Sequence, residues 1–272
     1  MQVVSVRSSD SPIVLGQPHG GTLVPDDIAA RLNDIGRGLA DTDWHINRLY
    51  DGVFTDATVV QSNIHRYVID ANRDPDGVSL YPGQNTTTLV PLTDFDGQPI
   101  WADGQEPSAD EIESRRHAYH APYHAALLQE LHRVRARHGV AILFDCHSIR
   151  SRIPFLFEGE LPVFNTGTND GQSCARVIEQ AVQGVAEGAE RMPAVLNGRF
   201  RGGWTTRHYG QPDQNIHAIQ MELAQRSYMD EAPPWTWRAD RAAALRPYLT
   251  DMLTRLNDLA RSGALTNQGA QT

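Results

Sequence analysis

Apolar residues along this chain fall into short runs separated by longer amphipathic segments, a pattern typical of alternating strands and helices. The clearest run covers residues 139–144, which are rich in β-branched and aromatic side chains, and it ends on the polar residues Asp145 to Ser148. Such a run predicts a buried central strand of an open α/β sheet. Because ligand crevices of these sheets lie at the carboxyl ends of strands, the polar end is the first candidate site.

The remaining runs predict further elements in the same alternation. Short apolar runs indicate strands at residues 11–16, 58–61, 65–70 and 217–223. Amphipathic segments indicate helices at residues 44–53, 110–138, 174–187 and 234–261, while 26–39 is interpreted as helical or irregular. Pro122 marks either a kink or a break in the second helix.

This alternation predicts one α/β domain over residues 1–272, with a sheet covered by helices on both faces. Residues 78–107 are rich in Gly, Pro, Thr, Asn and Asp, which predicts an irregular insertion. Insertions of this length inside a compact domain are usually functional or mobile.

The composition narrows the class of protein. The chain has 24 Lys and Arg against 33 Asp and Glu, a formal net charge of −9, whereas a general nucleic-acid binder normally carries a basic face. Its two cysteines are too few for a disulfide framework and suit a reducing compartment. The start of the chain does not resemble a signal peptide, and its apolar runs are shorter than a membrane span. We therefore expect a cytoplasmic protein without nucleic-acid or membrane partners; the oligomeric state is left open.

Three polar residues in separate segments form the favoured metal set. His19 lies on a Gly-rich loop, Asp43 at a predicted helix start, and His147 at the end of the central strand. Two imidazoles and a carboxylate are a normal ligand set for catalytic zinc, with one position open for water. Two of these residues also have an ordinary explanation: His147 as a hydrogen-bonded strand end, and Asp43 as a helix N-cap. Asp41 competes with Asp43, and Asp145 can orient His147 from the same side of the strand.

A second histidine group lies in the long predicted helix. His117, His120 and His124 share one helical face, with His132 further along. Of the carboxylates, Glu113 alone is near that face. The group therefore predicts either a rival metal site or, more simply, an interhelical or surface face.

Glu222 stands between Met221 and Leu223 in an apolar strand pattern. A buried carboxylate is costly unless it has a partner or a function. Beside a metal-activated water it can act as general base and then pass the proton to a leaving nitrogen. A salt bridge with Arg226 or Arg201 is the structural alternative.

Arginines in polar loops favour a small anionic substrate, because guanidinium groups bind carboxylates in a bidentate manner. Each of them can instead serve a structural ion pair. The four candidates are Arg66, Arg73, Arg201 and Arg207.

Taken in order, these residues resemble a known family. Four short segments, beginning at Pro18, Asp41, Asn72 and Asp145, read Pro-His-Gly-Gly, Asp-Thr-Asp-Trp-His, Asn-Arg-Asp-Pro and Asp-Cys-His-Ser. They are similar to motifs of the N-formylglutamate amidohydrolase family, and the resemblance extends over about residues 12–228. More distantly, the order of these segments with Asp-Ala-Asn-Arg at 70–73 and the late strand around Glu222 resembles the zinc carboxypeptidases and their relatives.

The resemblance implies a fold and an activity. The fold is three-layer α/β/α with a central mixed sheet, zinc-carboxypeptidase-like (phosphorylase/hydrolase-like). The activity is a zinc-dependent hydrolysis of N-formyl-L-glutamate, a small anionic N-acyl amino acid, to formate and L-glutamate in histidine degradation.

By position, the resemblance also assigns roles around one Zn²⁺ ion. His19 and His147 match the two histidine ligands, and Glu222 matches the catalytic glutamate. The carboxypeptidases have His-x-x-Glu, whereas Thr22 stands three residues after His19. We therefore expect Asp43 to supply the carboxylate ligand.

The substrate-binding roles follow in the same way. Asn72 and Arg73 match the pair that holds the substrate carboxylate in the carboxypeptidases. We expect Arg66 to help stabilise the oxyanion, and Arg201 or Arg207 to help bind the two carboxylates of the substrate.

Two other functions stay open. The same residues would serve hydrolysis of another N-acyl amino acid, as in the aspartoacylase and succinylglutamate desuccinylase relatives. A non-catalytic binder of small acidic ligands would keep the pocket without the metal. Glu222 argues against a non-catalytic binding protein, because an additional carboxylate does not help a pocket to bind an anion.

Overall fold

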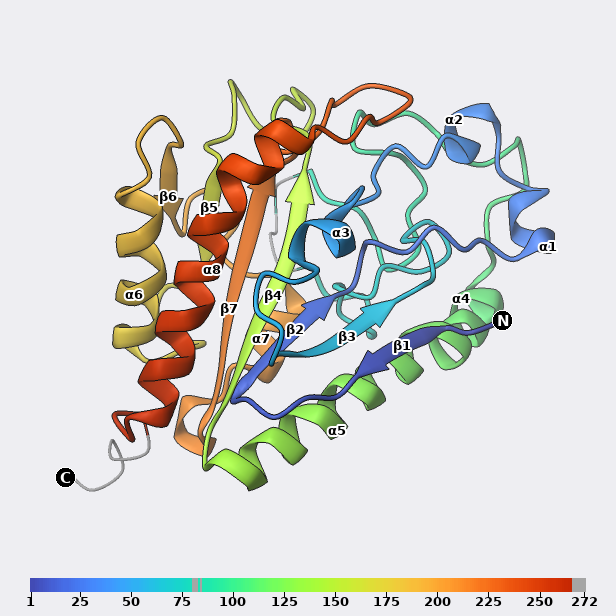
Figure 1. Cartoon of the computed structure of the whole chain (residues 1–272). Helices are drawn as coiled ribbons and strands as arrows, with labels where there is room; N and C mark the ends of the chain where they lie inside the picture. Colours follow the sequence, from blue (N-terminus) through green and yellow to red (C-terminus); the bar gives the residue numbers. More distant parts are fainter. Residues whose placement is uncertain (80–82, 84, 266–272) are drawn as a thin grey trace.

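The computed structural model describes residues 1–79, 83 and 85–265 (Figure 1). Within these residues, seven strands form one sheet in the order β1-β3-β2-β4-β7-β5-β6. β1 pairs antiparallel with β3, and β5 antiparallel with β7, whereas the central neighbours are parallel, so the sheet is mixed as predicted. The strands are β1 (Val4–Arg7), β2 (Ile13–Gln17), β3 (Thr58–Ser62), β4 (Ala141–Ile149), β5 (Phe164–Gly167), β6 (Ala194–Leu196) and β7 (Ile216–Ala224).

Helices cover both faces of this sheet (Figure 1). Alternate residues of β4 divide between two hydrophobic clusters: Phe144 packs with α3, α6 and α8, and Leu143 packs with α5 and α7. The predicted α/β/α arrangement is thereby confirmed. The helices that pack in these two clusters are α3 (Ile46–Tyr50), α5 (Ala121–His138), α6 (Arg176–Glu187), α7 (Trp204–Tyr209) and α8 (Ala239–Arg261). The other α-helices of the described residues are α1 (Asp26–Ala29), α2 (Asp34–Arg37) and α4 (Ala109–Arg115).

The central strands β4 and β7 are buried along their whole length. β4 runs to Ile149, further than the apolar run alone predicted, so its polar residues lie inside the strand. In the parallel register, Asp145 pairs with Gln220 and His147 with Glu222. The candidate residues of these two neighbouring strands thus lie side by side toward the carboxyl ends of the strands.

Residues 65–70, all of which the structure describes, do not form the predicted strand. The N–H of Tyr67 donates to His65 Nδ1 at 3.0 Å, and the N–H of Val68 donates to the His65 carbonyl. These local hydrogen bonds close a turn in competition with a sheet ladder. The sequence prediction was wrong here because it judged only the apolar character of the run.

The predicted helix over 110–138 is interrupted by a π-helical turn, Arg116–His120, between α4 and α5. Pro122 lies at the start of α5, where its missing N–H and its ring are tolerated. The predicted kink or break is therefore a wider turn in a continuing helix. No helix in the described ranges is long and apolar enough to cross a membrane.

The predicted insertion over 78–107 is irregular in its described part, apart from isolated bridges such as Thr93 with Pro99. Residues 80–82 and 84 of this segment lie outside the described residues. The insertion reaches the candidate site through Asn85, Thr86 and Thr87, which line the same cavity as His147.

Candidate active site

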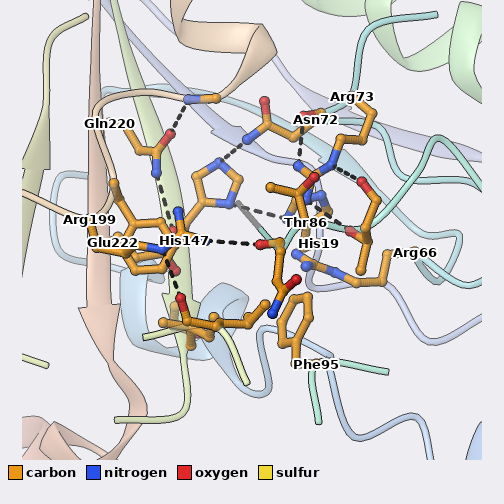
Figure 2. Close-up of a pocket in the computed structure, with 17 residues that line it drawn as sticks. His19, Arg66, Asn72, Arg73, Thr86, Phe95, His147, Arg199, Gln220 and Glu222 are labelled. Atoms are coloured by element: carbon orange, nitrogen blue, oxygen red, sulfur yellow. Dashed lines mark hydrogen bonds between the residues drawn. The ribbon is translucent and has the colours of Figure 1, made fainter. Parts of the chain in front are cut away.

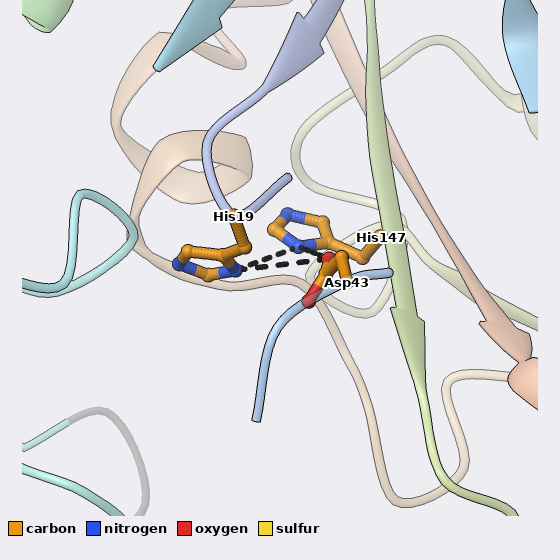
Figure 3. A group of neighbouring side chains, drawn as sticks. All are labelled: His19, Asp43 and His147. Atoms are coloured by element: carbon orange, nitrogen blue, oxygen red, sulfur yellow. Dashed lines mark hydrogen bonds and ion pairs between the residues drawn. The ribbon is translucent and has the colours of Figure 1, made fainter. Parts of the chain in front are cut away.

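Three side chains from separate segments meet at the carboxyl edge of the sheet (Figure 3). His19 follows β2, Asp43 precedes α3, and His147 lies in β4; one ligand atom of each is within 4.8 Å of the others. The two histidine Nδ1 atoms are 3.2 Å apart, and Asp43 Oδ2 lies 3.4 Å from that of His147 and 3.9 Å from that of His19. The structure thus brings together the three residues that the sequence suggested as a metal set.

The carboxylate of Asp43 is fixed by two donors. Arg66 Nη2 donates to Oδ1 at 3.2 Å, and the backbone N–H of Ser148 donates to Oδ2 at 3.0 Å. Burial alone would raise the pKa of Asp43, but His147 and Arg66 hold it below its usual range. His45 is the N-cap residue of α3, without a side-chain capping bond, so Asp43 is not the helix cap.

Asp41, the competing carboxylate, has other partners. Its Oδ2 accepts the Tyr67 hydroxyl at 2.8 Å and the Phe95 N–H at 2.9 Å, and Arg150 Nη2 lies 3.6 Å from Oδ1. Burial raises the pKa of Asp41 to about 7. The geometry therefore separates two aspartates that their spacing in the sequence could not.

Both histidines direct Nε2 away from the group and toward a carboxylate. His19 Nε2 is 2.6 Å from Asp70 Oδ1, and His147 Nε2 is 3.1 Å from Asp145 Oδ1. A carboxylate favours a proton on Nε2, which leaves Nδ1 as a lone-pair donor. Two imidazole lone pairs and an anionic oxygen then face one another, an arrangement that fits a cation.

The charges around His147 agree with that fit. Burial alone would lower the pKa of His147, yet Asp145 and Asp43 raise it well above its usual range. Burial lowers the pKa of His19 to about 4. The acidic side chains of Asp43 and Asp145 therefore favour a positive charge at the position between them.

The start of α7 contacts Asn72 and Asp145, whose side chains lie beside His147 Nε2, and sequence reasoning missed this role of Thr205 and Thr206. The Thr205 N–H donates to Asn72 Oδ1 at 2.8 Å, and Asn72 Nδ2 lies 3.1 Å from His147 Nε2. Thr206 Oγ1 donates to Asp145 Oδ2 at 2.9 Å. The available signal was the Gly-Gly pair before Trp204: a Cβ at Gly203 would stand 2.3 Å from the Asn72 amide.

A cavity opens beside these residues (Figure 2). With its open mouth included, the space that protein atoms leave free here is about 630 Å³. Polar and apolar side chains both contribute to its wall, among them His19, Arg66, Asn72, Arg73, Phe95, His147, Leu156, Arg199, Phe200, Gln220 and Glu222.

Glu222 lines this cavity and is 7% exposed. The Gln220 amide nitrogen donates to Glu222 Oε2 at 3.2 Å, and Gln220 Oε1 accepts the Gly203 N–H at 2.7 Å (Figure 2). Burial raises the pKa of Glu222 to about 8. The salt bridges that offered a structural explanation are formed elsewhere, since Arg226 pairs with Glu160 and Arg201 with Asp170.

Arg66 and Arg73 both lie at the cavity wall. Arg66 is buried against the ring of Phe95 and paired with Asp43, and its Nε finds no hydrogen-bond partner among the described residues. Arg73 donates from Nε to the Thr87 carbonyl at 3.0 Å and from Nη2 to Thr87 Oγ1 at 2.9 Å. Arg73 is thus held by the insertion.

Arg201 and Arg207 are not among the described residues that line the cavity. Arg201 pairs with Asp170, and Arg207 Nε donates to the Gly202 carbonyl at 2.8 Å. The geometry therefore gives no support to the expectation that they bind substrate. Arg199 is at the wall instead, and it donates to the carbonyls of Leu156 and Asn85, each at 3.1 Å.

The rival histidine group does not converge on a common point in the described part of the chain. His117 is exposed and lies 2.8 Å from Glu113, and His132 is exposed as well. His120 and His124 are buried and contact backbone carbonyls. The simpler interpretation, an interhelical or surface face, therefore describes this group: His120 and His124 are buried, and His117 and His132 are at the surface.

Comparison with known proteins shows clear relatives. The family model for N-formylglutamate amidohydrolase matches residues 11–229. N-formylglutamate deformylases from Pseudomonas aeruginosa and Pseudomonas putida are 45% and 44% identical, over 94% of this chain and 96% of each relative. The crystal structure of N-formylglutamate amidohydrolase from Ralstonia eutropha JMP134 has the same fold, with a TM-score of 0.81 at 22% identity, covering 97% of this chain and 100% of that one.

Proposed function

The chain belongs to the N-formylglutamate amidohydrolase family, and we propose that it hydrolyses N-formyl-L-glutamate to formate and L-glutamate, a reaction of histidine degradation. One observation carries the proposal: Glu222 shares a cavity with His19 and His147, which stand together with Asp43. A binder of small anions would have no use for this group of acidic side chains.

His19 Nδ1, His147 Nδ1 and Asp43 Oδ2 would hold one Zn²⁺ ion. When bound, zinc supplies a Lewis acid that polarises the formyl oxygen and lowers the pKa of a water. Asp70 and Asp145 keep the two imidazoles in the tautomer that presents Nδ1. Arg66 and the Ser148 N–H keep the Asp43 carboxylate turned toward them.

Glu222 acts as the general base and then as the general acid. Its carboxylate takes a proton from water as the water oxygen bonds to the formyl carbon, and it returns the proton to nitrogen as the C–N bond breaks. The pKa of about 8 that burial gives Glu222 lies near neutral pH, so the carboxylate that accepts the proton and the carboxylic acid that returns it are both populated there. Gln220 and the Gly203 N–H hold this side chain in place.

Arginines at the cavity wall bind the two substrate carboxylates. Arg73, next to Asn72, takes one, and Arg199 takes the place that the sequence had suggested for Arg201 or Arg207. Arg66, whose Nε keeps a donor unused among the described residues, stabilises the negative charge that develops on the formyl oxygen.

The test is a comparison of substrates with zinc-loaded protein. We expect kcat/KM for N-formyl-L-glutamate to exceed that for N-acetyl-L-glutamate and N-succinyl-L-glutamate by roughly tenfold or more, because the larger acyl groups must fit beside the buried residues His19, His147 and Glu222. N-formyl-L-glutamine, which lacks the distal carboxylate, should be hydrolysed more slowly if the arginines act as proposed. Release of free L-glutamate, or of L-glutamine from the amide substrate, is the measurement.

The other functions predict different outcomes. Preference for the acetyl or succinyl compound would replace the formyl assignment with an aspartoacylase-like or desuccinylase-like activity. Binding of N-formyl-L-glutamate without hydrolysis by zinc-loaded protein would identify a binder.

A further inference from the structure

Two histidines of the long helical segment contact the loop over residues 70–73. His124 Nε2 lies 2.8 Å from the Ala71 carbonyl oxygen, and His120 Nε2 lies 3.1 Å from the Arg73 carbonyl oxygen. A carbonyl oxygen only accepts, so both Nε2 atoms carry a hydrogen and donate it. Burial lowers the pKa of both imidazoles, which are therefore neutral at neutral pH.

The opposite side of the same loop meets the proposed zinc ligands. Asp70 Oδ1 is 2.6 Å from His19 Nε2, and Asn72 Nδ2 is 3.1 Å from His147 Nε2. Successive residues of the loop therefore alternate in direction: the side chains of residues 70 and 72 point to the proposed ligand histidines, and the carbonyls of residues 71 and 73 point to the helix. Asp70 accepts the hydrogen bond of His19, whereas Asn72, whose Oδ1 accepts the Thr205 N–H, places its amide nitrogen beside His147. A shift of the loop would therefore change the orientation of His19.

The donors themselves are firmly packed. The ring centroids of His120 and His124 are 4.2 Å apart, and the ring centroid of Trp204 in α7 lies 4.7 Å from that of His124. His124 Nδ1 is 3.0 Å from the Tyr209 hydroxyl, which completes its hydrogen bonds. The helix and α7 thus pack together behind the loop.

The π-helical turn distinguishes this pair from His117. In a regular helix, His117 would share the face of the other two, but the wider turn Arg116–His120 changes the phase, and the His117 side chain is 67% exposed. Only His120 and His124 then face the loop. Turns of this kind occur often at functional sites.

We propose that His120 and His124 are positioning residues of the active site, whose Nε2–H groups hold the 70–73 loop so that Asp70 orients the ligand His19. The proposal rests on the proposed function for the role of His19 and His147 as ligands. Beyond that function, we infer that the zinc affinity and the orientation of Arg73 depend on His120 and His124, whose side chains contact neither the metal nor the substrate.

The test compares two replacements at each position. His124→Gln places an amide N–H near the former Nε2, whereas His124→Leu removes the donor at similar volume, and the same pair applies to His120. We expect the Leu variants to bind zinc roughly 10–100-fold more weakly, as for the loss of other outer partners of ligands, with a comparable loss in kcat/KM. The Gln variants should restore most of both. His132→Leu, an exposed change on the same helix, is the matched control.

Zinc dissociation constants come from competition with a chelator, and thermal unfolding of the metal-free proteins reports the fold. Unchanged zinc affinity in folded Leu variants would overturn the proposal, as would equal losses in the Gln and Leu variants. Should a Leu variant not fold, His124→Asn, whose amide is too short to reach the Ala71 carbonyl, replaces it in the comparison. If the substrate assignment alone is wrong, wild-type protein fails to hydrolyse N-formyl-L-glutamate while the zinc affinities still order as stated.

Discussion

At the scale of single residues, the surroundings of Glu222 decide its chemistry. An exposed glutamate is ionised at neutral pH, but burial in β7 raises the pKa of Glu222 to about 8. Gln220 donates to one carboxylate oxygen and thereby fixes the side chain beside His147. The fixed position and the raised pKa are the two properties that a general base requires.

We expect Glu222→Gln to keep the metal and to lose kcat by about 10²–10⁴-fold, because the amide has the shape of the carboxylate but cannot accept the proton. Steady-state hydrolysis of N-formyl-L-glutamate and the zinc content of the purified variant are the measurements. Glu106→Gln, an exposed change in the insertion, is the control. A kcat near that of wild type would remove Glu222 from the mechanism.

The two aspartates before α3 show how far a sequence goes at this scale. Both are plausible ligands by type and spacing, and only tertiary partners separate them. Arg66, 23 positions from Asp43, and Ser148, 105 positions away, hold Asp43 toward the histidines, whereas Tyr67 bonds to Asp41. Residue type was therefore predictable and orientation was not.

At the scale of elements, the central strands were predictable because β4 and β7 are long, apolar and buried on both faces. The turn over 65–70 was not, since the His65 side chain closes it from within. The sequence also did not indicate that Arg199, in place of Arg201 or Arg207, lies at the cavity wall. That placement depends on how the chain enters α7, where the Thr205 N–H bonds to Asn72, 133 positions earlier.

The beginning of α6 allows a prediction about pH. The N–H of Ala175, the residue before the helix, donates to His217 Nδ1 at 3.2 Å, and burial lowers the pKa of His217 from 6.5 to about 4. Below pH 6.5 the unfolded chain binds a proton that the folded chain takes up only near pH 4. The free energy of unfolding therefore falls as the pH is lowered through this window and levels off below it.

The Oδ1 atom of an asparagine can accept the same N–H, but asparagine does not titrate. Between pH 7 and pH 4, we therefore expect the free energy of unfolding of His217→Asn to fall by up to about 3 kcal/mol less than that of wild type. Urea unfolding at several pH values measures this difference. His132→Asn, which changes an exposed histidine, should follow the wild-type curve. Parallel curves for wild type and His217→Asn would show that His217 does not contribute.

At the scale of the whole molecule, the proposed ligands belong to three segments that the sheet topology brings together. β2 and β4 are neighbours, so the residues at their carboxyl ends meet, and the segment before α3 closes over them. The Asp43 N–H, which donates to the His19 carbonyl at 3.1 Å, already links two of these segments. A metal ion held by all three would bind the folded chain and not the unfolded one, and it would therefore stabilise the entire fold.

That linkage gives the last prediction. Zinc at about one hundred times its dissociation constant should add about 2.7 kcal/mol to the free energy of unfolding, which for a chain of this size raises Tm by roughly 5–10 °C. Calorimetry of chelator-treated protein with and without zinc measures the rise. Asp43→Ala should abolish it. Asp41→Ala should start from a lower Tm, because the Tyr67 hydroxyl and Phe95 N–H lose their acceptor, yet it should keep the rise. The reverse pattern would make Asp41 the ligand, and an equal rise in both variants would exclude either aspartate from the metal site.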